Sequence, residues 1–349
     1  MIEFFSNFRK LVYDTTTGKS WQGELTGHQK YYAKLTHKYY GPFKILRPIN
    51  ETAVHNAFHV SLLKAYKGDP PQEPVMDDPS EFEGPEEILQ PEHIIRHEDK
   101  VLRNGKWGKK GFDKVLWGVK EFGCSPHPFV QFVHHSFDGE EGFPGEVDLS
   151  VIYRLSGDFE LCTEMEAVSL NKPTPINLAQ HSYWNLAGHD SGDILGHHIC
   201  IRASCITPVN EHFIPTGEYL FVDGTPFDFR YSRRIKDSIS NVSGGYDHNY
   251  VFDKEEKVQG DVHFAARVED TRSGRVMELF TNAPGMQFYT GNFVPDMQGK
   301  NGSKYSKHSG LCLETQGLPN ALNQPNFPTI VHKPGQVYKH IMIHRFSTT

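Results

Sequence analysis

The sequence predicts an all-β protein, built as an antiparallel sandwich over most of its length. Apolar and polar residues alternate most clearly from Val147 to Leu155, with Ile152 as the one interruption. Glycine-containing turn sequences separate such runs, and no helical periodicity lies between them. Aromatic residues make up 12% of the chain, which also has 31 glycines and 22 prolines. Many short strands joined by turns favour an antiparallel sandwich over an α/β fold.

Further strands follow from the same kind of pattern in the C-terminal two-thirds of the chain. Looser alternation continues after the turn that follows Leu155, and later runs of β-branched and aromatic residues are bounded by turn sequences. We expect these strands over 159–168, 175–178, 262–268, 275–281, 286–290 and 340–346.

Charge divides the chain into three parts. Residues 1–67 carry ten Lys/Arg against four Asp/Glu, whereas residues 68–100 carry two against eleven and contain a cluster of prolines. Such an acidic, proline-rich stretch buries little apolar surface and is typical of a linker. The sequence therefore predicts a small N-terminal segment over 1–67, a linker region over 68–110 and a β-sandwich over 111–349.

Composition argues against several classes of protein. The net charge of -7 over 349 residues disfavours a nucleic-acid binder. No apolar run approaches the roughly 18 residues of a membrane helix. The five cysteines include no CxxC pair, which disfavours a disulfide framework and a zinc knuckle. Because no signal peptide is recognisable either, we expect a cytoplasmic protein with reduced thiols and no membrane contact.

Two distant segments carry the side chains best suited to proton transfer. His181 lies in a run of Asn, Gln, Ser and aromatic residues, and Glu314 lies in a short apolar strand that ends in polar residues. Imidazole and carboxylate groups exchange protons near neutral pH. A structural histidine and an exposed glutamate on an edge strand are the alternative interpretations.

Residues that suit a sugar accompany this pair. Gln287 is flanked by aromatic residues, and amides and rings hold sugars through hydrogen bonds and stacking. Asp247 adds a second carboxylate, although a turn aspartate and a strand glutamine are the simpler interpretations. Four histidines between 181 and 198 match no zinc motif, and no GxSxG elbow is present. The local sequence thus disfavours metal and serine chemistry, and leaves open whether these residues form a sugar site or have structural roles.

Long motifs of the C-terminal part resemble the aldose 1-epimerase (galactose mutarotase) family, in family order. They occupy 111–117, 135–145, 177–189, 207–218, 224–229, 244–252, 284–292 and 310–328. The resemblance implies a β-supersandwich of the galactose-mutarotase type, and the interconversion of α- and β-anomers of aldohexoses such as galactose and glucose. It implies an aldose as the small-molecule partner and neither a metal nor an organic cofactor, and we expect a monomer.

The resemblance also implies roles for individual residues. His181 matches the general acid that protonates the ring oxygen. Glu314 matches the general base that takes the proton from the anomeric hydroxyl. The positions implied to bind the sugar are Asp247, Gln287, Tyr183 and Asn292.

The family pattern is incomplete on its N-terminal side. The family's arginine segment and HGG histidine have no counterpart, and residues 107–109 (Trp-Gly-Lys) stand where that histidine would lie. Residues from about 30 to 106 instead resemble the SH3-like tail of a gypsy-type retrotransposon integrase and a partial chromodomain, which indicates a chimera. Three functions stay open: an aldose 1-epimerase impaired by the missing segment, a non-catalytic nucleic-acid or chromatin-associated module, and an inactive sugar-binding remnant.

Overall fold

The computed structural model describes residues 111–349, apart from gaps at 113–114, 125, 158, 212 and 254–260, and five short strands before them. β1 pairs with β2, β4 with β5, and β3 with β6. The other residues of the predicted integrase-like segment and linker lie outside the described part. The five strands are β1 (Tyr13–Asp14), β2 (Lys19–Ser20), β3 (Tyr32–Lys34), β4 (Phe43–Ile45) and β5 (Leu63–Ala65).

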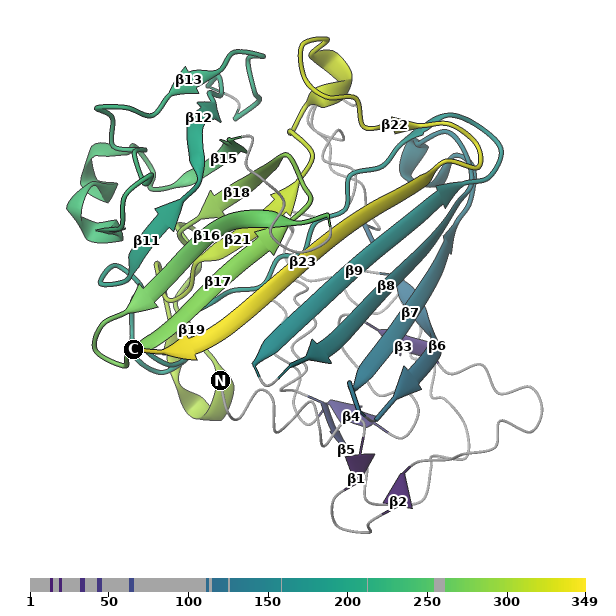
Figure 1. Ribbon diagram of the computed structural model, residues 1–349, viewed down its shortest axis with the longest axis horizontal. Coiled ribbons are helices and arrows are strands. Elements are labelled where there is room, and N and C mark those ends of the chain that lie inside the picture. The colour runs from purple at the N-terminus through teal and green to yellow at the C-terminus, as the bar shows by residue number, and fades with distance from the viewer. Residues whose placement is uncertain are drawn as a thin grey trace.

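Ten antiparallel strands form the larger sheet, in the order β14-β11-β16-β17-β23-β9-β8-β7-β6-β3. Figure 1 shows it as a broad twisted layer, with the long C-terminal strand β23 crossing its middle. Its other bounds are β6 (Leu116–Gly123), β7 (Phe129–Ser136), β8 (Val147–Ser156), β9 (Glu160–Ser169), β11 (His198–Ile201), β14 (Arg233–Arg234), β16 (His263–Asp270), β17 (Arg275–Thr281) and β23 (Val337–Thr348).

Five antiparallel strands form the smaller sheet, in the order β13-β12-β15-β18-β21. It lies beside the β11-β16-β17 end of the larger sheet (Figure 1). Because β21 is the last strand in this order, one of its edges is open to pairing with a loop. The bounds are β12 (Ala203–Thr207), β13 (Leu220–Phe221), β15 (Asp247–Phe252), β18 (Gly285–Tyr289) and β21 (Cys312–Gln316).

The remaining elements are short. β10 (Thr174–Pro175) pairs with β22 (Val331–His332), and β19 (Met297–Gln298) pairs with β20 (Lys304–Tyr305). Within the described part of the chain, no helix has the length and apolar character that a membrane crossing requires. The helical pieces of the described residues are the 3-10 turns η3 (Glu140–Gly142), η4 (Ile235–Asp237), η5 (Ile239–Asn241), η6 (Lys300–Gly302) and η7 (Ala321–Asn323).

Apolar side chains of both sheets share one core. On β8, burial alternates along the strand as the sequence predicts, because successive side chains point to opposite faces. On β18 in the smaller sheet, Met286 and Phe288 are fully buried in the same core. Gln287 and Tyr289 must therefore lie on the other face of the smaller sheet. The predicted antiparallel β-sandwich is confirmed, and its alternation decides which residues can form a site.

The predicted strands agree closely with the structure, with one exception. The expected strand 275–281 coincides with β17, and the others shift by a few residues at their ends. The exception is 175–178, where the strand stops at Pro175. Beyond it, the Asn177 side chain bonds the backbone of Gly317, and the Leu178 backbone bonds the Tyr338 hydroxyl. Side-chain partners thus replace the ladder of a strand here, and the chain continues as a loop towards His181.

Candidate active site

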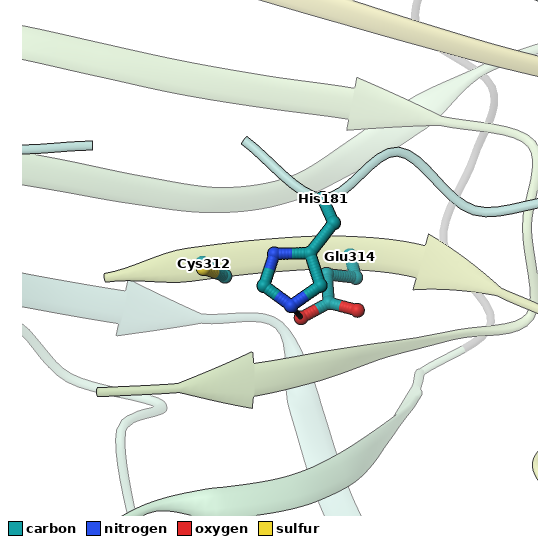
Figure 2. A group of neighbouring side chains, drawn as sticks. All are labelled: His181, Cys312 and Glu314. Atoms are coloured by element: carbon teal, nitrogen blue, oxygen red, sulfur yellow. Dashed lines mark ion pairs between the residues drawn. The ribbon is translucent and has the colours of Figure 1, made fainter. Parts of the chain in front are cut away.

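His181 and Glu314, the two side chains predicted to move protons, meet in the folded protein. The distance between His181 Nε2 and Glu314 Oε1 is 3.4 Å, and the two side chains are 3% and 0% exposed. Figure 2 shows the imidazole lying over β21 with one nitrogen directed at the carboxylate. Burial removes the screening of bulk water, so the two groups interact more strongly than they would at the surface. The alternative of an exposed edge-strand glutamate is excluded, although β21 is an edge strand.

The loop that carries His181 is attached to both ends of β21. After the C-terminal end of the strand, Asn177 Nδ2 donates to Gly317 O at 3.1 Å, and Gly317 N donates to Asn177 Oδ1 at 2.7 Å. Before the strand begins, Trp184 and Leu311 exchange two backbone hydrogen bonds of 2.8 and 2.9 Å. His181 lies between these attachments, so the loop holds the imidazole over Glu314. Neither attachment can be predicted from the residues around it, because each joins segments that are far apart in the chain.

Asp247 and Gln287 lie beside the acid–base pair and bond to each other. Gln287 Nε2 donates to Asp247 Oδ1 at 2.6 Å. The register places Gln287 directly opposite Glu314 and Asp247 directly opposite Tyr289. Directly opposed residues of antiparallel strands share a face, so carboxylate, amide and phenol groups gather on the side of the sheet that faces away from the core.

Two aromatic rings pack around His181. The Tyr183 ring stacks on the imidazole with centroids 4.9 Å apart and planes inclined by 29°. Tyr289 approaches both rings edge-on, with its centroid 6.3 Å from that of His181. These contacts fix the orientation of the imidazole plane and exclude water from part of its surroundings. The Tyr183 ring itself is half-buried.

Asn292, the fourth residue predicted to bind sugar, has its amide bonded within the protein. Its Nδ2 donates to Tyr246 O at 2.8 Å, and its Oδ1 accepts from Thr290 Oγ1 at 2.7 Å. It packs so closely under Gly245 that a Cβ there would lie 2.1 Å from Asn292 Oδ1. These contacts brace the turn before β15, and the role of Asn292 in sugar binding stays a prediction.

His340 is a residue of this region that sequence reasoning missed. Its Nδ1 lies 2.9 Å from Leu178 O, and its Nε2 lies 2.8 Å from Thr315 Oγ1. Because a carbonyl oxygen only accepts, Nδ1 carries the proton and Nε2 accepts from the threonine. Burial lowers the pKa of His340 to about 4, so the ring is neutral. It links the loop before His181 to the neighbour of Glu314, and no local sequence signal marks it.

Cys312 also lies at the site without having been predicted there. It precedes Glu314 by two residues on β21, so both side chains lie on the same face. Among the described residues, one group of His, Cys, Asp and Glu side chains could share a metal ion, namely His181, Cys312 and Glu314, with ligand atoms within 4.8 Å of one another. Burial raises the pKa of the thiol well above its ordinary value, and the charges of Glu314 and Asp247 raise it further.

The histidines considered together with His181 as metal ligands have other contacts. His197 Nε2 accepts a hydrogen bond from Leu186 N at 2.9 Å, and burial lowers the pKa of this histidine to about 4. His189 Nδ1 lies 3.2 Å from the Tyr305 hydroxyl. These histidines therefore serve packing and loop structure, and only His181 reaches the site.

Comparisons with known proteins agree with this geometry. The family described as aldose 1-epimerase matches residues 103–345. Galactose mutarotase of Homo sapiens is 45% identical over 69% of this chain and 68% of its own length. Aldose 1-epimerase of Haemophilus influenzae is 34% identical over 66% of this chain and 68% of its own length.

A solved structure of an aldose epimerase homologue is also similar to this chain. It is described as a GalM/aldose epimerase homologue from C. elegans, with a TM-score of 0.63 and 26% sequence identity, and the match covers 69% of this chain and 71% of that one. The predicted resemblance of the N-terminal segment to an integrase lies almost wholly before the matched residues and stays a prediction. The chain belongs to the aldose 1-epimerase family.

Proposed function

We propose that this protein is an aldose 1-epimerase, an isomerase that interconverts the α- and β-anomers of aldohexoses such as galactose and glucose. Relatives named galactose mutarotase and aldose 1-epimerase support the reaction. The observation that carries the proposal is the buried contact of 3.4 Å between His181 Nε2 and Glu314 Oε1. The ring oxygen and the anomeric hydroxyl are bonded to the same carbon, so two groups this close can address both oxygens at once.

Ring opening needs one proton delivered and one removed. His181 donates a proton to the ring oxygen while Glu314 takes the proton of the anomeric hydroxyl. The bond between the anomeric carbon and the ring oxygen breaks, and the carbon becomes the aldehyde of the open chain. Rotation about the adjacent carbon–carbon bond presents the other face of the aldehyde, and the reverse transfers close the ring. Each positioned acid or base typically contributes ~10²–10⁴-fold in rate, or roughly 3–5 kcal/mol.

Asp247 and Gln287 bind the sugar hydroxyls in this proposal. Their mutual hydrogen bond of 2.6 Å orients the amide, and the second carboxylate oxygen and the amide oxygen can receive hydroxyl protons. The Tyr183 ring offers an apolar surface to the C–H face of the sugar. Asn292 supports the turn that carries Asp247. We also propose a monomer, and the cysteine pattern supports a cytoplasmic location.

Polarimetry of freshly dissolved α-galactose tests the proposed reaction with the purified full chain. The rate of optical change should rise in proportion to protein and saturate with sugar. Glu314→Gln should abolish most of the increase, whereas Glu164→Gln should leave it intact, because Glu164 lies on β9 and pairs with Lys339. Saturable galactose binding with no acceleration would instead indicate an inactive sugar-binding protein. The absence of both acceleration and saturable binding would contradict any role in sugar chemistry.

A further inference from the structure

Cys312, His181 and Glu314 together offer a sulfur, a nitrogen and an oxygen ligand in one neighbourhood. One ligand atom of each lies within 4.8 Å of the others, and Figure 2 shows His181 against Glu314 with Cys312 further along β21. We propose that this cluster binds a single Zn²⁺ ion, and that the ion inhibits the protein by occupying its acid–base pair. The inhibition rests on the proposed epimerase function, whereas the binding does not.

The ligand set and its spacing suit zinc. Zinc takes thiolate, imidazole and carboxylate ligands at about 2.3, 2.0–2.1 and 2.0–2.2 Å, which places neighbouring tetrahedral ligand atoms roughly 3.3–3.6 Å apart. The separation of His181 Nε2 and Glu314 Oε1 is already 3.4 Å. No two ligand atoms of the group are more than 4.8 Å apart, so side-chain movements of about 1 Å would bring all three to the spacing that zinc requires. A tetrahedral ion would keep its fourth position for water.

The fold holds these ligands in place. Cys312 and Glu314 are on one strand, and each faces a residue of β18 in the ladder, Tyr289 and Gln287. His181 is fixed by its stacked ring and by the loop attachments on both sides of it. All three side chains are buried. Ligands held by rigid elements lose little freedom when the ion arrives.

Zinc binding and proton transfer exclude each other. A bond forms between zinc and the Cys312 sulfur as the thiol proton leaves to solvent, and His181 Nε2 and Glu314 each donate a lone pair to the ion after releasing any proton they carry. These lone pairs are the ones that general acid–base catalysis requires. Oxygen-preferring ions such as Mg²⁺ gain little from a thiolate and should not bind here.

Cobalt spectroscopy tests the binding with the full-length chain. One equivalent of Co²⁺ should produce a thiolate-to-cobalt charge-transfer band and the intense visible bands of a tetrahedral site, and Zn²⁺ should displace them. Cys312→Ser should remove the charge-transfer band and weaken cobalt binding by about 100-fold or more. Cys205→Ser is the matched control, because that cysteine lies on β12 of the same sheet but outside the cluster.

The absence of the charge-transfer band, or its persistence in a folded Cys312→Ser protein, would overturn the zinc site. Cys312→Ala repeats the test without a hydroxyl that could bind the ion. Excess galactose should bleach the cobalt bands, because sugar and metal compete for His181 and Glu314. That competition is measurable without turnover, so an inactive protein would sink the proposed function and leave the zinc site standing. Co-occupancy by galactose and cobalt would contradict the inhibition, as would a rate that equimolar Zn²⁺ leaves unchanged.

Discussion

Gln287 and Glu314 face each other directly across β18 and β21. The hydrogen-bond ladder of the sheet therefore holds two groups side by side. One is the amide that we propose binds the sugar, and the other is the carboxylate that we propose takes a proton from it. On the same face, Asp247 bonds to the amide from β15. Binding and catalysis thus depend on the register of three strands, and changes in that register should affect both.

Removing the amide should weaken sugar binding more than it slows the chemistry. Gln287→Ala loses the bond to Asp247 Oδ1 and the amide contacts to hydroxyls, so KM for galactose should rise by about tenfold, equivalent to ~1.4 kcal/mol, with a smaller change in kcat. Asp247→Ala should act in the same direction. Because the two side chains are bonded, the double variant should cost less than the sum of the single variants. Additive effects in steady-state polarimetry would contradict a coupled pair.

Gly285 offers a way to disturb the sheet without touching the site chemically. A Cβ at this position would lie 2.8 Å from Tyr250 O and 2.9 Å from Leu318 Cδ2. Gly285→Ala should therefore push β18 away from β15 and lower the free energy of unfolding by roughly 1–3 kcal/mol. It should also raise KM, because Gln287 lies two residues further along the strand. Gly118→Ala is the control, since its Cβ meets nothing closer than 3.7 Å.

His340 should act as a positioning residue. His340→Phe removes the bonds to Leu178 O and Thr315 Oγ1, so the loop before His181 and the strand of Glu314 lose a shared anchor. We expect a loss of about 1–3 kcal/mol in stability and a fall in kcat that exceeds any change in KM. His340→Asn keeps a donor near Leu178 O and should recover part of kcat. A stability loss with kcat unchanged would show a purely structural role.

Buried neutral histidines should make the protein sensitive to acid. Burial lowers the pKa of His340 and of His344 to about 4, below the value near 6.5 expected in the unfolded chain. Below pH 6.5 the unfolded chain therefore binds protons that the folded chain excludes until about pH 4. The free energy of unfolding should be level above pH 6.5 and fall as the pH drops, by about 1.4 kcal/mol per pH unit for each such histidine.

His344→Leu provides the control for that pH dependence. Neither ring nitrogen of His344 has a hydrogen-bond partner among the described residues, so an apolar side chain of similar size should be tolerated or stabilising at neutral pH. Urea denaturation of this variant between pH 7 and 4 should show a slope shallower by about one proton. An unchanged slope would mean that His344 does not drive the acid sensitivity.

The fold could be predicted well from sequence because alternation is a local property. The run from Val147 to Leu155 and the strand 275–281 are visible in a few residues each, and both are strands in the structure. Residues 175–178 resemble a strand locally, but Asn177 and Leu178 find partners in segments far along the chain. Whether such a segment forms a strand or a loop therefore depends on its tertiary contacts.

The sequence predicts the residues proposed to carry the reaction, but it gives no signal for the residues that support them. His181, Glu314, Asp247 and Gln287 stand in distinctive motifs, and the structure brings them together. His340 shows no such motif, because its role comes from contacts with distant segments. Cys312 stands in no metal motif, and the sequence does not show that β21 places it on the same face as Glu314. The neighbours of such residues depend on strand register and tertiary contacts, which cannot be read directly from the sequence.

The central claim is that His181 and Glu314 act together as acid and base. The direct measurement is kcat/KM for α-galactose, by polarimetry, for His181→Ala, Glu314→Gln and the double variant, with His135→Ala as a folded control from β7. Each single variant should lose about 10²–10⁴-fold, and the double variant should lose little more than the worse single one, because both proton transfers belong to the same ring-opening step. Near-normal rates in either single variant would contradict the claim.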